Sequence, residues 1–423
     1  MKKICYFACY WLIYSACQPS TPTAPPTGKP PTATPTDSTA TSVRFRLTFV
    51  GDIMGHSQQF EAAYDPATKL YDYEICFRYI RPLLEQSDLA IGNLELTLND
   101  KPHYTGYPCF RSPDALAGYL HNAGFDMLVT ANNHSNDNRL YGITHTLDVL
   151  DSLQVLHTGT FRDSAERRKT YPFLHTITKD KQSIRLAMLN YTYGTNGIPT
   201  PKPAVVNLID TAQILADIQR AQILQPDVLI AVLHWGNEYK LQPNAAQKQL
   251  TQWLWRNGVS VVIGAHPHVI QPVELDTATH DDGSPQINYC AYSLGNFVSN
   301  QDKPNTDMGL LVNLTFEKNL TTQRVQLVEH DYIPLWRYIH NRQKATNARN
   351  FIVVPVSAFE GDTTNFLQFA AQDLRAMQTV AQRIRTHLRK WDSQERLLQW
   401  DEIIQPHTLR PSESPQTPAN AEG

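Results

Sequence analysis

Five stretches of the chain repeat one pattern: an apolar run ends in small residues and is followed at once by a side chain that can bind a metal ion or a proton. The clearest is Val259–Val269, VSVVIGAHPHV. Its apolar, largely β-branched run is too short for a buried helix, so we expect an interior strand that ends in a sharp turn at Gly264. His266 and His268 follow two residues apart, and both imidazoles can point into one cavity beyond the carboxyl end of the strand.

The other four stretches end in residues of the same chemical type: LTFVGD at Leu47–Asp52, LAIGNLE at Leu89–Glu95, MLVTANNH at Met127–His134 and VLIAVLHWG at Val228–Gly236. Imidazole is the commonest metal ligand, and a histidine pair after a hydrophobic strand suits Zn, Mn or Fe. Two loop histidines with satisfied hydrogen bonds would explain an isolated pair equally well. Unrelated loop residues have no reason to repeat the pattern, so the sequence predicts one shared site.

Predicted helices alternate with predicted strands along residues 43–340. Strands are expected at Arg46–Val50, Ser87–Leu98 and Ile184–Tyr191, and apolar residues at helical spacing predict helices at Tyr73–Glu85, Asp114–Ala123, Leu140–Leu153, Thr211–Leu224 and Ala245–Asn257. This alternation predicts a layered α/β domain with largely parallel central strands.

The pattern changes after the HPH loop. Ile287–Leu294, Gly309–Phe316 and Arg324–His330 alternate like antiparallel strands that extend the sheets. Residues 341–405 are expected to form a strand and helical extension, in which Ala370–Trp391, and the chain on to Ile404, make one or two helices packed outside the domain. A helix that binds a partner is the alternative. Residues 406–423 are polar, and we expect a disordered tail.

The first 42 residues predict an exported, tethered protein. Lys2 and Lys3 precede an apolar run too short to span a bilayer, and small residues come just before Cys17. Residues 1–17 therefore resemble a bacterial lipoprotein signal in which Cys17 is acylated; an ordinary secretory signal or an uncleaved anchor is the alternative. Residues 18–42 are almost entirely Pro, Thr, Ser and Ala, which predicts a solvated tether. We expect a protein held by lipid to a membrane of the cell envelope, on the periplasmic or surface side.

The composition limits which binding partners and which metal ligands can be expected. Lys and Arg total 37 against 40 Asp and Glu, a net charge of −3, and no basic patch interleaved with aromatics suggests a nucleic-acid partner. Beyond the signal, Cys76, Cys109 and Cys290 remain. An odd number of cysteines without close spacing argues against a thiolate zinc site and permits at most one disulfide bridge. With 41% hydrophobic residues, the chain can bury a large core.

Two carboxylates lie at predicted strand ends. Asp52 can ligate a divalent cation, and His56, four residues on, can reach the same ion; a plain Gly-Asp turn is the alternative. Glu95 stands among leucines, where a carboxylate needs a partner. The sequence leaves open whether that partner is a metal ion or a buried arginine.

Amide and imidazole groups complete the set. Asn133 is a weak neutral ligand that suits a two-metal site already supplied with carboxylate charge, and His134 can act as general acid or hold a substrate oxyanion; helix capping is the alternative for this turn. His234 ends an apolar strand, where ligation or a firm hydrogen bond is expected. Glu238 and Tyr239 follow within reach of substrate. Such a set suits two metal ions bridged by a carboxylate, which stabilise the attacking and leaving oxygens of a displacement at phosphorus.

Seven segments, in order, resemble the CapA family, the capsule or poly-γ-glutamate biosynthesis proteins with a calcineurin-like metallophosphoesterase fold. They cover about Leu47–Val298 and read VGDIMGH, IGNLELTL, TANNHSND, NYTYGTNGIP, LHWGNEY, IGAHPHVIQPVE and YSLGNFV. The resemblance implies a four-layer αββα double sheet. It also implies a set of site residues: Asp52 and His268 on one divalent ion, Asn133, His234 and His266 on a second, Glu95 bridging the two, and His134 as the acid beside the leaving group.

Four more residues are candidates for binding metal or substrate: His56, Asn93, Glu238 and Asn296. The expected cofactors are two divalent ions, which Mn, Fe or Zn would supply. Two functions fit the resemblance. One is a lipid-anchored, metal-dependent hydrolase acting on a phosphoester or an envelope polymer. The other is an accessory factor that binds, exports or anchors an anionic envelope polymer without cleaving it.

Overall fold

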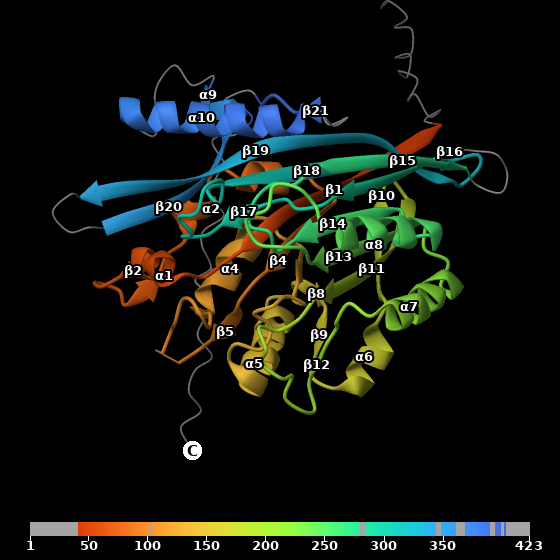
Figure 1. The fold of residues 1–423 in the computed structure, drawn as a ribbon, viewed down its shortest axis with the longest axis horizontal. Helices are drawn as coiled ribbons and strands as arrows, with labels where there is room; N and C mark the ends of the chain where they lie inside the picture. Colours follow the sequence, from red (N-terminus) through yellow and green to blue (C-terminus); the bar gives the residue numbers. More distant parts are fainter. Residues whose placement is uncertain are drawn as a thin grey trace, which may run out of the picture. The chain divides into compact units, whose positions relative to one another are not determined.

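Two β-sheets lie face to face in the computed structural model of the protein (Figure 1). The structure describes residues 41–101, 103–279, 285–343, 348–360, 369–389, 394–398 and 402. The predicted signal with Cys17, the predicted tether up to residue 40 and the predicted tail at 406–423 lie outside the described residues. Lipidation and the tail's disorder therefore stay predictions.

The first sheet contains nine of the described strands. Its parallel part consists of β1 (Ser42–Ile53), β4 (Leu89–Leu94), β7 (Met127–Val129) and β8 (Leu156–Thr158). Beyond β1 the sheet continues through antiparallel strands: β18 (Met308–Asn319), β19 (Val325–Gln343) and β20 (Ala348–Pro355). Two short strands attach to it, β17 (Asn296–Val298) to β1 and β21 (Gln394–Glu395) to β19.

The second sheet contains six described strands, in the spatial order β10 (Phe173–Lys179), β11 (Gln182–Thr192), β13 (Val228–His234), β14 (Val261–Ala265), β16 (Pro285–Ala291) and β15 (Val273–Thr279). The four inner strands are parallel, and the two edge strands are antiparallel to their neighbours. The predicted parallel centre is thus confirmed in both sheets. Three strand pairs stand apart: β2 (Tyr64–Asp65) with β3 (Leu70–Tyr71), β5 (Thr97–Asn99) with β6 (Arg111–Pro113), and β9 (Thr160–Phe161) with β12 (Val205–Val206).

Alternation along β13 shows how the layers pack. Ile230 and Val232 point into the core between the sheets, which also contains Phe49 of the first sheet. Ala231 and Leu233 point the other way and are buried in a separate cluster with apolar residues of the helices on the outer face. A strand buried on both faces reads as a continuous apolar run, as this one does.

Helices cover the outer faces of both sheets. The second sheet is covered by α7 (Thr211–Ile223) and α8 (Ala245–Arg256); α9 (Val356–Glu360) and α10 (Ala371–Leu388) pack against β19. The remaining helices are α1 (Ser57–Ala63), α2 (Glu74–Phe77), α3 (Arg81–Leu84), α4 (Ala115–Asn122), α5 (Arg139–Ser152) and α6 (Ser164–Thr170). The predicted αββα double sheet with a C-terminal helix is confirmed.

Two helix predictions need correction. The single helix expected over Tyr73–Glu85 is two short helices, α2 and α3, joined by a turn. Pro82 explains the break, because proline lacks an amide hydrogen and its ring clashes with the carbonyl four residues earlier. The helix expected over Ala370–Trp391 ends at Leu388, and the chain beyond it returns as a strand, Gln394–Glu395, paired with β19.

One turn prediction also needs correction, because Gly264 lies inside β14 and does not end it. Gly51 likewise lies inside β1. Both glycines instead let another backbone segment approach closely. A Cβ on Gly264 would lie 1.9 Å from the carbonyl oxygen of Tyr292, and a Cβ on Gly51 would lie 1.8 Å from the carbonyl oxygen of Gly295. The predicted strand Arg324–His330 is part of the much longer β19, which crosses residue 341, where the extension was predicted to begin.

A buried ion pair ties α7 to the second sheet. The Asp217 carboxylate is fully buried and accepts hydrogen bonds from Arg167 Nη2 at 2.6 Å and from the Tyr191 hydroxyl at 2.9 Å. We expect Asp217→Ala to lower the free energy of unfolding by about 3–5 kcal/mol, because it leaves a largely buried guanidinium without its carboxylate partner. Urea denaturation measures this. Gln219→Ala on the exposed side of the same helix is the control and should change stability by less than about 0.5 kcal/mol; equal effects of the two substitutions would contradict the expectation.

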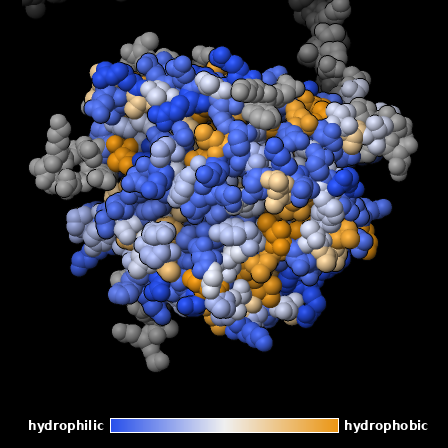
Figure 2. Space-filling model, in the orientation of Figure 1, coloured by the Kyte–Doolittle hydropathy of each residue, from blue (hydrophilic) through white to orange (hydrophobic). Residues whose placement is uncertain are grey.

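Hydrophilic residues cover most of the face shown in Figure 2, with smaller hydrophobic areas among them. Within the described part of the chain, none of the helices has the length and apolar character needed to cross a membrane. Cys76, Cys109 and Cys290 are all free thiols. Burial raises the pKa of the Cys76 and Cys290 thiols, so neither is poised to act as a thiolate.

Candidate metal centre

The five predicted site segments meet in one place. β1, β4 and β7 are parallel neighbours in the first sheet, and β13 and β14 are parallel neighbours in the second, so their carboxyl ends lie at common edges. The sheets bring these edges together. Six side chains from these ends are each at most 3% exposed: Asp52, Glu95, Asn133, His234, His266 and His268.

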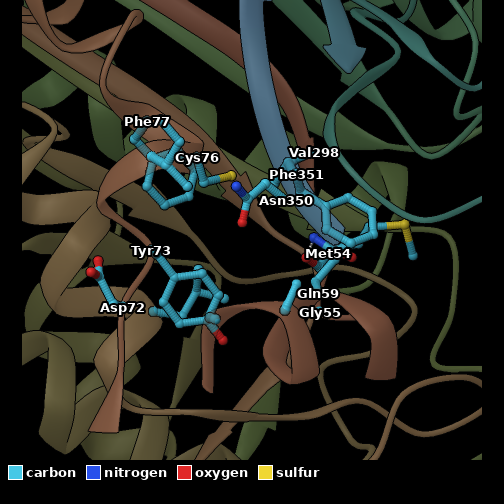
Figure 3. A pocket seen from close by; sticks show the side chains of 14 residues that line it. Met54, Gly55, Gln59, Asp72, Tyr73, Cys76, Phe77, Val298, Asn350 and Phe351 are labelled. Carbon is cyan, nitrogen blue, oxygen red and sulfur yellow. Dashed lines mark hydrogen bonds between the residues drawn. The ribbon is translucent and has the colours of Figure 1, made fainter. Parts of the chain in front are cut away.

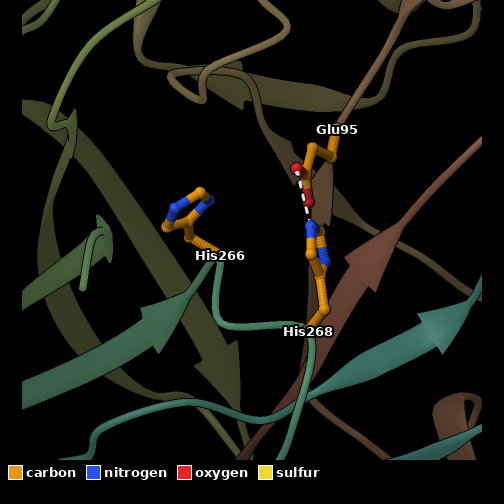
Figure 4. Close-up of side chains that lie close together, drawn as sticks. All are labelled: Glu95, His266 and His268. Atoms are coloured by element: carbon orange, nitrogen blue, oxygen red, sulfur yellow. Dashed lines mark ion pairs between the residues drawn. The ribbon is translucent and has the colours of Figure 1, made fainter. Parts of the chain in front are cut away.

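Two groups of ligand-type side chains share one carboxylate. Glu95, His266 and His268 offer ligand atoms within 4.8 Å of one another, and so do Asp52, Glu95 and His234. Figure 4 shows the first group, with the Glu95 carboxylate facing the ring of His268. Glu95 Oε1 lies 3.8 Å from His268 Nε2 and 3.5 Å from His234 Nε2. Glu95 therefore stands between the two sets.

An amide network connects the remaining residues. Asn93 Nδ2 donates to Asp52 Oδ1 at 2.8 Å and lies 3.3 Å from His234 Nδ1. On the other side of that ring, His234 Nε2 lies 2.8 Å from Asn133 Oδ1. The His266 backbone amide donates to the Asp52 carboxylate at 3.2 Å. Each residue is thus held by a neighbour from a different strand end, which preorganises the cluster.

The ring of His268 is oriented by Asn296 at the start of β17. His268 Nδ1 lies 3.1 Å from Asn296 Oδ1 and also 3.1 Å from Asp52 Oδ2. The Asn296 amide nitrogen in turn donates to Ser299, Gln301 and the Thr306 carbonyl, each at 2.9 Å. An Asn held in this way fixes which ring nitrogen carries the proton, and leaves His268 Nε2 facing Glu95.

The sharp turn of the HPH loop falls at the histidines themselves. His266 has φ +96° and His268 has φ +58°, in the left-handed region that a side chain other than glycine rarely adopts. Such a conformation costs about 1–3 kcal/mol per residue and persists where the surrounding structure imposes it. The strain is concentrated at the two residues that face Glu95 and Asp52.

Several buried atoms of this cluster lack a hydrogen-bond partner among the described residues: Glu95 Oε1 and Oε2, Asn93 Oδ1 and His266 Nδ1. Burial, and then the negative charge of Asp52, raise the pKa of Glu95. Burial and the neighbouring histidines lower the pKa of His234, and lower that of His266 to about 3. Buried carboxylate and imidazole groups whose lone pairs lack partners form a donor set that a divalent cation satisfies. The residues therefore fit a metal.

His134 stands beside the cluster with a carboxylate behind it. His134 Nδ1 lies 2.6 Å from Asp137 Oδ2, both groups are buried, and the ring of Phe110 packs against the imidazole at 4.6 Å between centroids. Asp137 Oδ2 also accepts the Phe110 amide at 2.6 Å. This pairing leaves the opposite nitrogen, Nε2, as the one available to a substrate.

His56 belongs to neither ligand group. Its Nδ1 lies 3.1 Å from Gln59 Oε1 and accepts the Asn300 amide at 3.2 Å, at the start of α1. Asn93 and Asn296 lie within hydrogen-bond distance of candidate ligands, as given above, and Glu238 is an exposed side chain after β13. Their roles in binding stay predictions.

Burial lowers the pKa of His56 to about 4. The folded state therefore holds this ring neutral while the unfolded chain protonates it below about pH 6.5. Stability contributed by His56 is present above that pH and is lost as the pH falls toward 4, by at most about 1.4 kcal/mol per pH unit. Urea denaturation of wild type and of His56→Gln between pH 7 and pH 4.5 measures this. Wild type should lose more stability than the variant, and parallel pH profiles would contradict the expectation.

The family model for bacterial capsule synthesis protein PGA_cap matches residues 46–301, more than half of the chain. The chain belongs to this family. The match contains every candidate ligand and ends before β18, so β18 to β21, α9 and α10 lie outside it. The family resemblance predicted from the seven segments is confirmed.

Individual relatives carry similar descriptions. The PGA biosynthesis protein CapA of Bacillus subtilis (strain 168) is 26% identical over 280 residues, covering 65% of this chain and 68% of that protein. The capsule biosynthesis protein CapA of Bacillus anthracis is 25% identical over 288 residues, covering 66% of this chain and 65% of that protein. The matches thus span about two thirds of each relative. Among solved structures, a novel phosphatase from Mycoplasma pneumoniae aligns with a TM-score of 0.36 and 14% identity, over 70% of this chain and 94% of that one.

Sequence reasoning missed two features of the site. Asp137 lies in the turn for which helix capping was the alternative, and it was not named as a site residue, although its position three residues after His134 allows the contact seen here. Tyr193 was not singled out at all; its ring lies 4.6 Å from that of His266 and is stacked on that of His234 at 6.3 Å. The pattern contains no ligand-type atom at Tyr193, so a search for metal ligands passes over it.

A separate small cavity lies near α1, α2 and β20 (Figure 3). Its volume is about 20 Å³, room for about one water molecule, and its walls include Cys76, Tyr73 and Asn350. None of the candidate metal ligands lines it. This cavity therefore lies apart from the candidate metal centre.

Proposed function

We propose that the protein acts in the biosynthesis of a capsule or related envelope polymer as a metal-dependent phosphoester hydrolase. The observation that carries the proposal is the buried cluster in which two ligand groups share Glu95 and several inward-facing atoms lack partners. A cluster that served only packing would leave fewer polar atoms unpaired, because each costs about 1–3 kcal/mol. Membership of the capsule synthesis family supports the biological setting.

Two divalent ions, Mn, Fe or Zn, would be held by this set. Following the family resemblance, Asp52 and His268 would bind one ion, Glu95 would bridge, and the second ion would be bound by Asn133, His234 and His266. Grouping by distance instead places His266 with His268 and Asp52 with His234, with Glu95 common to both. Both assignments share Glu95 between the two ions, and the proposal includes either of them. When bound, such ions activate water and stabilise charge on the phosphoryl oxygens.

The chain's own residues supply orientation and proton transfer. His134 Nε2 would protonate the leaving oxygen, while Asp137 holds Nδ1 and stabilises the charged ring. Asn93 and Asn296 would keep Asp52, His234 and His268 in place through the contacts described above. Burial of the ligands excludes bulk water from them.

The proposed location rests on the first 42 residues of the sequence. We propose that Cys17 is acylated and holds the domain at a membrane of the cell envelope through the tether at 18–42. The substrate would then be a phosphoester or an anionic polymer of the envelope. We propose no nucleic-acid partner, because binding to phosphate backbones depends on positive charge and the chain has a net charge of −3.

Hydrolysis and metal content test the proposal together. Purified protein loaded with Mn²⁺ should contain about two ions per chain and hydrolyse bis(p-nitrophenyl) phosphate. His234→Ala should lose metal and at least about 10²-fold in kcat/KM. His121→Ala, an exposed histidine on α4, should leave both unchanged. A protein that binds envelope polymer but holds no metal and cleaves nothing would instead be an accessory factor.

A further inference from the structure

Two exposed tyrosines lie at the rim of the metal centre. Among the described residues, four tyrosines are exposed: Tyr64, Tyr107, Tyr193 and Tyr239. Two of them contact candidate ligands. The ring of Tyr193 covers His266 and His234, and the ring of Tyr239 lies 6.1 Å from that of His268. An aromatic ring normally buries a large apolar area, so open tyrosine faces beside a reactive site indicate a binding surface.

Each of these two tyrosines stays partly exposed despite its ring contacts. Tyr193 is 48% exposed although it packs on two imidazoles, and Tyr239 is 38% exposed. The Tyr193 amide donates to the His234 carbonyl at 2.9 Å, and the Tyr239 amide donates to the Pro267 carbonyl at 2.8 Å. Both rings are therefore anchored by their backbones to the loops that carry the candidate ligands. Tyr239 is held at φ +62°, a conformation that tyrosine rarely adopts.

An exposed carboxylate, Glu238, immediately precedes Tyr239 on the same loop. Burial, and then the charge of Glu238, raise the pKa of Tyr193, and the same causes raise that of Tyr239 to about 12. Glu238 is exposed, so its oxygens can accept hydrogen bonds from a ligand without loss of a buried partner. The rim thus combines two open aromatic faces with a hydrogen-bond acceptor of negative charge.

We propose that Tyr193, Tyr239 and Glu238 form a sugar-binding subsite, and that the phosphoester bound at the metal centre is a hexosyl phosphate. This rests on the proposed function. The C–H face of a pyranose packs on an aromatic ring, and its hydroxyls donate to a carboxylate. A poly-γ-glutamate chain carries carboxylates, which Glu238 would repel. A nucleobase would use the ring faces but has fewer hydrogens to donate to Glu238.

Calorimetry of the Mn²⁺-loaded full chain at pH 7 tests the subsite with ligands that resist hydrolysis. The phosphonate analogue of glucose 1-phosphate should bind about 3- to 10-fold more tightly than that of glycerol 3-phosphate, the gain expected from aromatic contact. Tyr193→Ala and Tyr239→Ala should each reduce this preference. Tyr193→Phe should keep it, because the ring face remains.

Tyr64→Ala is the matched control, since Tyr64 is equally exposed but its ring contacts Tyr71; its preference should equal that of wild type. Equal affinity for the two phosphonates would overturn the subsite while leaving the metal centre intact. Tighter binding of adenosine monophosphate or of penta-γ-glutamate than of the glucose analogue would also overturn it. A protein that takes up no metal and binds neither phosphonate would overturn both the subsite and the proposed function.

Discussion

Glu95→Gln should remove metal from both positions of the centre and yet stabilise the metal-free protein. Glu95 is the carboxylate common to both ligand groups, and an amide is a far weaker ligand for a divalent ion than a carboxylate. We expect the metal content to fall from about two ions per chain to less than one, and phosphodiesterase activity to fall by at least about 10³-fold. Elemental analysis and a bis(p-nitrophenyl) phosphate assay measure the two.

The opposite effect on the metal-free protein follows from the sign of the pKa shift. The pKa of Glu95 is raised above its usual 4.5, so the folded state must keep a proton that the unfolded chain releases at lower pH. Wild-type stability contributed by this group is present below about pH 4.5 and is lost as the pH rises. Glutamine resembles the protonated acid and has no such loss. In EDTA at pH 8, Glu95→Gln should raise Tm by about 2–4 °C, and at pH 4.5 the two proteins should melt together.

Glu238→Gln provides the comparison, because Glu238 is exposed and belongs to neither ligand group. That variant should keep its metal and its Tm in EDTA. Retention of two ions by Glu95→Gln would contradict the role of Glu95 as a shared ligand. A lower Tm of the metal-free variant at pH 8 would contradict the raised pKa of Glu95.

Asp137→Asn should reduce turnover while leaving the metal in place. The Asp137 carboxylate lies 2.6 Å from His134 Nδ1 in a buried setting, where it would stabilise the positive charge of the ring in the proposed role as an acid. A neutral amide removes that stabilisation. We expect kcat to fall by about 10²-fold with little change in KM, the range for loss of one acid or base group. His134→Ala should fall at least as far, and the two substitutions together should cost little more than His134→Ala alone.

The leaving group separates this role from a structural one. A substrate with an activated leaving group, such as a p-nitrophenyl ester, needs less protonation than an alkyl ester, so the Asp137→Asn defect should be larger on the alkyl ester. Unchanged kcat on both substrates, or loss of metal in the variant, would show that His134 and Asp137 do not act as the acid pair.

The layers of the fold could be predicted because apolar runs and helical spacing report burial directly. The interior strands such as β13 are apolar on both faces, and α7 begins after Asp210, whose side chain caps it. The break at Pro82 follows from the proline itself, which the spacing of apolar residues does not register. The true length of β19 depends on tertiary pairing, which periodicity does not encode. Gly51 and Gly264 gave a turn signal although their function is close contact with another strand.

The candidate site could be predicted as a set of strand ends, because parallel neighbours place their carboxyl ends at one edge. The sequence did not specify contacts that depend on side-chain direction. Asp137 reaches His134 across a turn, and Asn296 reaches His268 from a strand beyond the HPH loop. Tyr193 follows β11 directly and packs against two imidazoles at the ends of neighbouring strands, a contact that depends on side-chain direction.

Anomalous diffraction from crystals soaked in Mn²⁺ tests the central claim most directly, because it locates ions without relying on activity. The account predicts two anomalous peaks on either side of the Glu95 carboxylate, contacted by His234, His266 and His268. Crystals of Glu95→Gln should show at most one weak peak. No peak at Glu95 in fully soaked wild-type crystals, with the six buried side chains in their present positions, would contradict the account.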